Sequence, residues 1–260
     1  SKYLGCEHIV SSRQVNGKSV RVMSYDMSGF FEQCVDRYLE LANVKRETLR
    51  PASTPFIDMA LQPSDDDENG GGELQPIASR VLMKVLYGAR MVRYDLLRAV
   101  SYLATRVTKW SRFCDRCLHR LMCYVNSTKS FVLEGYVGDE QCALFTVFYS
   151  GADFAGCKVT MRSTSGVFLA LEGPNTFYPL AAISKKQTCV SHSTPEAELV
   201  AADLAVRSEG LPALDVWDTL LGRPTKLAFR EDNQAAIQVL RTGKNPTMRH
   251  LGRTHRVSIK

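Results

Sequence analysis

The chain is 260 residues long, with 45% hydrophobic and 23% charged residues. These values are typical of a globular protein whose core suffices for one large domain or two ordinary ones, and they exclude a largely disordered chain. There are 33 Lys and Arg residues against 27 Asp and Glu residues, so the formal net charge is +6. A basic excess favours a polyanion as partner, because Lys and Arg that contact phosphates release counterions.

The sequence indicates neither a membrane nor an oxidising compartment. No run of 18 apolar residues could span a bilayer, and the N-terminus lacks the pattern of a secretory signal. Eight cysteines at irregular spacing do not form a disulfide scaffold in a chain of this length, so reduced thiols are expected. The chain begins at Ser1 and ends at Lys260 after a basic segment, which indicates a piece of a longer intracellular protein.

The first 140 residues are predicted to hold short strands, helices and a linker. Hydrophobic periodicity predicts strands at residues 2–9 and 19–24, a helix at 27–41, and at least two helices over 78–106 and 110–125. The run QPSDDDENGGGELQ at residues 62–75 combines four consecutive acids with three consecutive glycines, so it is expected to be a linker or an exposed loop.

Four potential zinc ligands lie close together in the last of these helices, namely Cys114, Cys117, His119 and Cys123. A zinc site of this kind needs a second pair of ligands at a suitable distance, and the thiols follow the helical pattern of their apolar neighbours. We interpret them as core or surface thiols.

The remaining residues alternate strands and helices. Strand-like runs occur at residues 144–149, 165–171 and 177–183, a helix is expected from Ser193 to about Glu209, and then come a helix at 214–221, a strand at 226–230 and a helix at 234–240. This order predicts an α/β domain.

Two glutamates near the start of the helix after Ser193 have different predicted roles. Ser193 can cap the helix, and Glu196, three residues later, can fold back to bond the N–H of the cap. Glu198 lies roughly 200° from Glu196 around the helix, on the same face as the small residues Ala201 and Ala202 that are expected to press on a sheet. A carboxylate on that face needs a cation or a hydrogen-bond partner, although a partly exposed surface Glu is the simpler interpretation.

Two aspartates follow strand-like runs. Asp232 comes after the strand at residues 226–230, where ligands of α/β sheets bind, but it could simply cap the next helix. Asp153 lies just past the expected end of the strand at residues 144–149. Together with Glu198 these acids fit a cluster that binds two Mg²⁺ ions about 4 Å apart for phosphodiester hydrolysis.

Six motifs in order resemble the ribonuclease H region of copia-type retrotransposon Pol polyproteins. They are residues 149–156 (YSGADFAG), 162–166 (RSTSG), 183–187 (ISKKQ), 193–198 (STPEAE), 231–236 (EDNQAA) and 253–255 (RTH). Upstream, residues 2–5 and 51–55 resemble the stretch after the palm of the reverse transcriptase, and residues 85–101 resemble the helical segment that joins polymerase to nuclease. The resemblance covers nearly the whole chain.

The resemblance implies a fold and a division of the chain. The fold class is α/β, a ribonuclease H-like mixed sheet with flanking helices, preceded by a smaller α+β or helical tail and connection. The implied parts are the end of the reverse transcriptase (1–61), the acidic and glycine-rich linker (62–76), a helical connection (77–140), and a ribonuclease H-like domain (141–260) with its last helix truncated. Polymerisation is not expected, because no YxDD-like run is present.

The resemblance also implies Mg²⁺- or Mn²⁺-dependent hydrolysis of the RNA strand of an RNA/DNA hybrid. Glu198 and Asp232 correspond to metal ligands, Asp153 is a provisional ligand, and His255 could assist proton transfer or product release. The implied partners are the hybrid and the rest of the polyprotein, with no membrane and no small-molecule cofactor, in a cytoplasmic particle or the nucleus. Lys185, Lys186, Lys244, Arg249 and Arg253 are expected to contact phosphates.

The sequence departs from the family pattern at two acidic positions. Gly151 stands where the family has its first aspartate, and neither Val257 nor Ser258 supplies the last acid. Asp153 would be displaced by about 6.6 Å from the first position on a regular strand. A competing hypothesis is therefore a non-catalytic domain that binds nucleic acid or braces a polymerase.

Overall fold

The computed structural model describes residues 1–57, 71–158, 160–243 and 246–258. Contacts divide the chain into two compact units, each made of two stretches of sequence. The first unit is Ser1–Val10 with Met23–Glu134, and the second is Ser11–Val22 with Gly135–Lys260. The predicted start of the nuclease-like domain at residue 141 is close to Gly135, whereas the sequence did not predict that residues 11–22 belong with it. Lys244 and most of the predicted linker lie outside the described residues.

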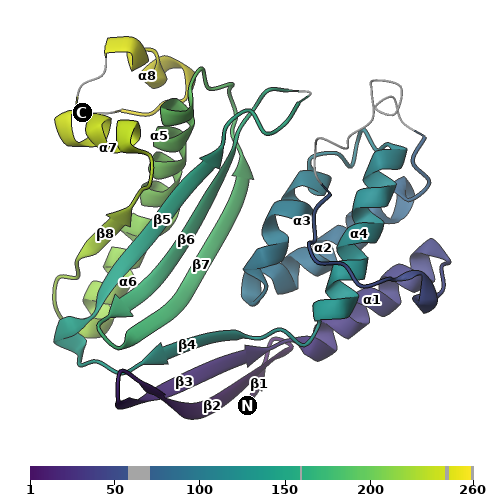
Figure 1. Ribbon diagram of the computed structural model, residues 1–260, viewed down its shortest axis with the longest axis horizontal. Coiled ribbons are helices and arrows are strands. Elements are labelled where there is room, and N and C mark those ends of the chain that lie inside the picture. The colour runs from purple at the N-terminus through teal and green to yellow at the C-terminus, as the bar shows by residue number, and fades with distance from the viewer. Residues whose placement is uncertain (58–70, 159, 244–245, 259–260) are drawn as a thin grey trace. The chain divides into compact units, whose positions relative to one another are not determined.

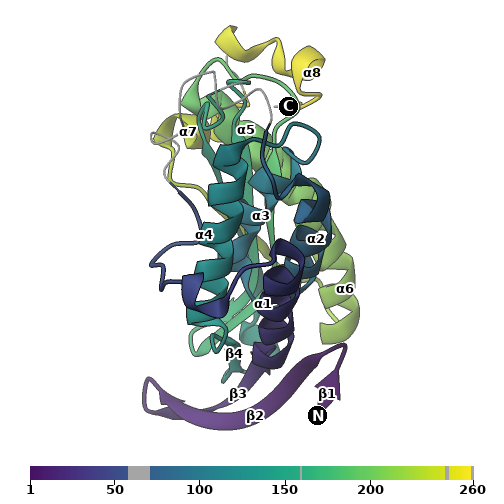
Figure 2. The ribbon, with the colours of Figure 1, turned by 90° about the vertical axis from the view of Figure 1, so that its right-hand side faces the viewer.

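The first unit is mainly helical, and α1 to α4 pack against one another (Figure 2). Its elements are β1 (Lys2–Tyr3), the first part of β2 (Cys6–Val15), the last part of β3 (Lys18–Asp26), α1 (Ser28–Ala42), η1 (Arg46–Thr48), α2 (Gln75–Met91), η4 (Tyr94–Leu96), α3 (Leu97–Ala104) and α4 (Arg112–Thr128). The predicted helices are present because apolar residues recur every three or four positions, as Val81, Leu82 and Val85 do in α2, where all three are buried.

The thiols of α4 belong to the core of the first unit. Cys114, Cys117 and Cys123 are free and buried, which confirms that they are core thiols. Ser111 caps the helix by accepting a hydrogen bond from the N–H of Cys114. His119 is engaged elsewhere, since its Nδ1 lies 2.9 Å from the hydroxyl of Tyr38.

The second unit combines a sheet with helices on one face (Figure 1). Its main elements are most of β4 (Leu133–Val137), η5 (Gln141–Ala143), β5 (Phe145–Asp153), β6 (Thr164–Gly173), β7 (Thr176–Lys186), α5 (Thr194–Ala205), the π-helical turn η6 (Val206–Gly210), α6 (Leu211–Leu221), β8 (Leu227–Arg230), α7 (Gln234–Thr242), η7 (Pro246–Met248) and α8 (Leu251–Thr254). The described strands form one mixed sheet in the order β1-β2-β3-β4-β7-β6-β5-β8.

The pairing of β5 sets the geometry of the second unit. It is antiparallel to β6 and parallel to β8, with Tyr149 opposite Arg230 at the end of β8. Parallel strands bring their carboxyl ends to the same edge, so Ser150 lies beside the residues that follow β8. Phe148 is buried among Val167, Ala205 and other residues that join the sheet to α5 and the helix after it.

The strands predicted at residues 144–149, 165–171 and 177–183 are longer than expected, and β4 was not predicted. Asp153 is the last residue of β5 rather than a residue beyond it. The helix predicted to run from Ser193 to about Glu209 ends at Ala205, because the chain continues through the π-helical turn into α6.

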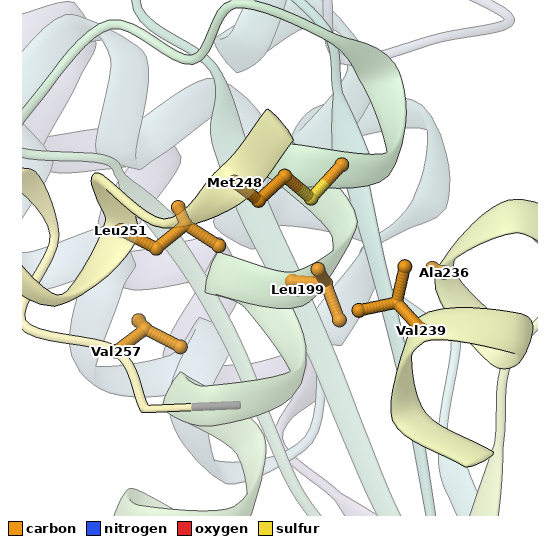
Figure 3. Packing of buried hydrophobic residues seen from close by; sticks show 6 residues of the cluster. All are labelled: Leu199, Ala236, Val239, Met248, Leu251 and Val257. Carbon is orange, nitrogen blue, oxygen red and sulfur yellow. The ribbon is translucent and has the colours of Figure 1, made fainter. Parts of the chain in front are cut away.

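The C-terminal residues pack on α5 and α7 through one apolar cluster (Figure 3). The side chains come from α5, α7 and the segment after residue 246, namely Leu199, Ala236, Val239, Met248, Leu251 and Val257. Val257 is buried in this cluster, whereas Ser258, one of the positions where the resemblance suggested an acid, is exposed.

Candidate metal and nucleic-acid site

The start of α5 is fixed by a cap that the sequence predicts in part. Ser193 accepts a hydrogen bond from the N–H of Glu196 at 3.4 Å, as expected. The carboxylate of Glu196 accepts from the N–H of His192 at 3.1 Å, one residue before the predicted donor. Glu196 is also fully buried and its Oε1 lies 3.2 Å from Nε2 of His250. Its role is therefore structural.

Glu198 points in another direction and lies against β5. It is only 7% exposed, and the N–H of Ala152 donates a hydrogen bond to its carboxylate. Its Oε2 is buried and has no hydrogen-bond partner among the described residues. The interpretation of Glu198 as a partly exposed surface residue is wrong, because the residue is buried. A buried carboxylate oxygen without a partner is rare in proteins.

The residues after β8 supply two further acids. Asn233, not Asp232, caps α7, since its side chain accepts from the N–H of Ala236 at 2.9 Å. Glu231 accepts hydrogen bonds from the hydroxyl of Ser150 at 3.2 Å and from the N–H of Asn233 at 3.1 Å. Asp232 is consequently free of the capping role that was the alternative interpretation.

Glu198, Glu231 and Asp232 form one acidic group. Each offers a carboxylate oxygen, and these oxygens lie within 4.8 Å of one another. Burial and the neighbouring carboxylates of Glu231 and Asp232 raise the pKa of Glu198 to about 7. Burial also raises the pKa of Glu231. Such shifts are expected where negative charges gather away from water without a cation.

The composition of the acidic group suits a hard divalent cation. Mg²⁺ prefers carboxylate oxygens, and the unpartnered Oε2 of Glu198 is a ligand atom without another use in the described structure. A cavity of about 730 Å³ opens beside the acids. Its lining includes Ser150, Glu231 and Asp232, together with the two cations Arg230 and Arg241.

Two residues of the predicted site lie outside the acidic group. The carboxylate of Asp153 accepts a hydrogen bond from the N–H of Thr164, and it lies so close to Gly156 that a β-carbon there would be 2.2 Å from its Oδ2. Asp153 therefore shapes the turn after β5. Glu231 joins the acidic group instead. It precedes Asp232 in the motif EDNQAA and was not predicted to be a ligand.

His255 does not occupy the expected position beside the acids. Its side chain is 1% exposed, and Nε2 lies 3.3 Å from Oε1 of Glu196. Neither ring nitrogen has a hydrogen-bond partner among the described residues, because the contact with Glu196 lacks hydrogen-bond geometry. A buried side chain does not fit the predicted role of a mobile group near metal ions.

The predicted phosphate contacts lie at separate places in the second unit. Lys185 is exposed near the end of β7, whereas Lys186 donates a hydrogen bond to Sγ of Cys157 at 3.0 Å. Arg249 and Arg253 are exposed in the C-terminal segment.

No helix in the described part of the chain has the length and apolar character needed to cross a membrane.

Comparison with known proteins gives one relative. Neither the models of known protein families nor the solved structures match this chain. The secreted RxLR effector protein 161 of Plasmopara viticola is 32% identical over 142 residues, which are 55% of this chain and 91% of that protein. With this identity over nearly the full length of the relative, the chain belongs to the same family as the secreted RxLR effector protein 161 of Plasmopara viticola.

Proposed function

We propose that the second unit is a ribonuclease H-like nuclease of copia-type retrotransposon origin, which hydrolyses the RNA strand of an RNA/DNA hybrid with Mg²⁺ or Mn²⁺. The observation that carries this proposal is the acidic group, in which Glu198 from α5 meets Glu231 and Asp232 after β8. Glu231 and Asp232 follow the carboxyl end of β8, where ligands of α/β sheets bind, and with Glu198 they offer the carboxylate oxygens that metal-assisted phosphodiester hydrolysis can use.

Each side chain has a defined part in the proposed reaction. Glu198 and Asp232 would hold Mg²⁺, and Glu231 would complete the set of oxygens. Bound Mg²⁺ supplies a more acidic water and a Lewis acid for the phosphate. Arg230 and Arg241, which line the adjacent cavity, would hold a phosphate of the substrate near the acids. Because the proposed contacts go to phosphates, little sequence specificity is expected.

The test is cleavage of a labelled RNA/DNA hybrid by the complete chain in the presence of Mg²⁺ or Mn²⁺. Asp232→Asn should reduce the rate at least roughly 100-fold, because even groups that only orient metal ligands cost about 10–100-fold when removed. Asp215→Asn is the matched control, since Asp215 is exposed on α6 and lies outside the acidic group. Cleavage that survives Asp232→Asn would contradict the assignment.

The alternative is a non-catalytic domain that binds nucleic acid or braces a polymerase. Gly151 favours it, because the family pattern has an acid there. Hybrid binding without metal-dependent cleavage by the unchanged chain would support this alternative over the nuclease.

A further inference from the structure

A second cavity of about 310 Å³ lies on α5, and it shares no lining residue with the cavity beside the acidic group. One helical face contributes Val200, Asp203, Leu204 and Arg207, which recur at helical spacing. The other walls come from the end of β7 and from the C-terminal segment, with Lys185 and His255 among them.

Cations dominate the charged groups that a ligand would meet in this cavity. Lys185 is exposed, and the side chain of Arg207 is 65% exposed, so both can turn toward a ligand. Arg207 forms an ion pair with Asp203, in which nitrogen and oxygen lie 3.6 Å apart, a distance beyond that of a hydrogen bond. Lys186 also lines the cavity, but its ammonium is already bonded to Cys157. Lys185, Lys186 and Arg207 outnumber Asp203 in the lining, and this positive excess favours an anionic ligand.

His255 provides a second and independent indication of a ligand. Its side chain is almost fully buried and lines the cavity, and within the part of the chain that the structure describes both ring nitrogens lack hydrogen-bond partners. A buried N–H without an acceptor costs free energy. The ring nitrogen that carries the proton has no acceptor among the described residues, and a ligand anion beside the ring would supply one.

The polar groups that complete the lining are already paired within the protein. Gln187 donates to Ser165 and to the carbonyl of Ala197. Ser208 donates to the carbonyl of Leu204, and Thr188 donates to Sγ of Cys189. The groups left for a ligand are thus an ammonium, a guanidinium and an imidazole. All three are donors that recognise phosphate oxygens.

We propose that this cavity is a binding site for a phosphate group, held by Lys185, Arg207 and His255. The phosphate comes either from a nucleic-acid backbone or from a free phosphate or phosphomonoester, because the three donors would recognise both. The site does not depend on the proposed hydrolysis, since Glu198, Glu231 and Asp232 take no part in it.

The experiment is a titration of the complete chain with inorganic phosphate at constant ionic strength, followed through the imidazole signals of His255 in NMR spectra. The expected result is a saturable shift of these signals. Lys185→Gln and Arg207→Gln should each raise the dissociation constant about tenfold, the effect of losing one charge-assisted contact. Lys226→Gln is the matched control, because Lys226 does not line the cavity, and should change the constant less than about twofold.

Two further measurements identify the source of the phosphate and test the phosphate site independently of the proposed hydrolysis. A short RNA/DNA hybrid that displaces phosphate from His255 identifies the nucleic-acid backbone as the source, and a hybrid without this effect identifies a free phosphate or phosphomonoester. Asp232→Asn should bind phosphate unchanged, so loss of cleavage and loss of this site are distinguishable. The absence of a saturable shift, or equal affinity in all variants that keep the native melting temperature, would overturn the phosphate site.

Discussion

Glu198 is a carboxylate in surroundings that disfavour its charge. Its pKa in the metal-free fold is about 7, whereas an unfolded glutamate has a pKa of about 4.3. The stability that neutral Glu198 contributes is therefore fully present below about pH 4.3 and is lost as the pH rises through about 7. Binding of Mg²⁺ requires the charged form, so the affinity for Mg²⁺ should fall as the pH drops below about 7.

Glu198→Gln should therefore stabilise the metal-free protein at pH 8, by on the order of 2 kcal/mol, and should have little effect near pH 4. Thermal unfolding at the two pH values measures this difference. Added Mg²⁺ should raise the melting temperature of the unchanged protein more than that of the variant, through preferential binding to the folded state. A variant less stable than the unchanged protein at pH 8 would show that the fold stabilises the charged form of Glu198.

Gly151 and Asp153 offer a pair of substitutions with opposite expected results. A β-carbon at Gly151 would meet no atom of the described residues within 4 Å, so these residues leave room for an aspartate. If this position lacks a metal ligand, Gly151→Asp should raise Mg²⁺-dependent cleavage. Asp153→Asn should instead lower stability by about 1–3 kcal/mol through the turn at Thr164, with a smaller effect on Mg²⁺ binding. Calorimetric titration with Mg²⁺ distinguishes the two, and loss of Mg²⁺ binding in Asp153→Asn would restore Asp153 as a ligand.

The C-terminal helix α8 is an element whose position depends on a few side chains. Leu251 is 1% exposed in the apolar cluster of Figure 3, so Leu251→Ala should cost about 2–5 kcal/mol of unfolding free energy. Leu220→Ala is the matched control, because Leu220 on α6 is 62% exposed and should change stability by less than about 0.5 kcal/mol. Chemical denaturation measures both. Equal effects would mean that α8 does not pack as described.

The prediction of elements from sequence succeeded where periodicity was long and uninterrupted. The helices α1, α2, α4 and α7 and the strands β5 to β8 follow runs with a clear period. The end of α5 was missed, because nothing in the run Val206 to Gly210 marks a π-helical turn. The site was predictable in part, because the position of Glu198 on its helix indicated that it faces inward. That Glu231 rather than Asp153 joins the acidic group depends on the pairing between β5 and β8, which cannot be derived from the sequence.

At the scale of the whole molecule, the basic excess should appear in the salt dependence of nucleic-acid binding. Neutralising both Arg249 and Arg253 should reduce the slope of log K against log salt concentration by about 1.4 to 1.8, if each contacts one phosphate. Neutralising the exposed Lys2 and Lys18 provides the control. Fluorescence anisotropy with a labelled hybrid measures the slopes, and an equal slope for all three proteins would make Arg249 and Arg253 ordinary solvated charges.

Residues 11–22 belong to the second unit, and this affects the order in which the two units fold during synthesis. The side chain of Asn16 donates a hydrogen bond to the side chain of Asn175. Val20 packs so closely on Gly138 that a β-carbon at Gly138 would lie 2.4 Å from the Val20 side chain. The ribosome releases these residues before it has made Met23–Glu134, an interval of roughly 6 to 20 s at the usual speed of synthesis. The first unit can therefore finish folding during translation, while the hairpin tip formed by residues 11–22 has to wait for partners that arrive last.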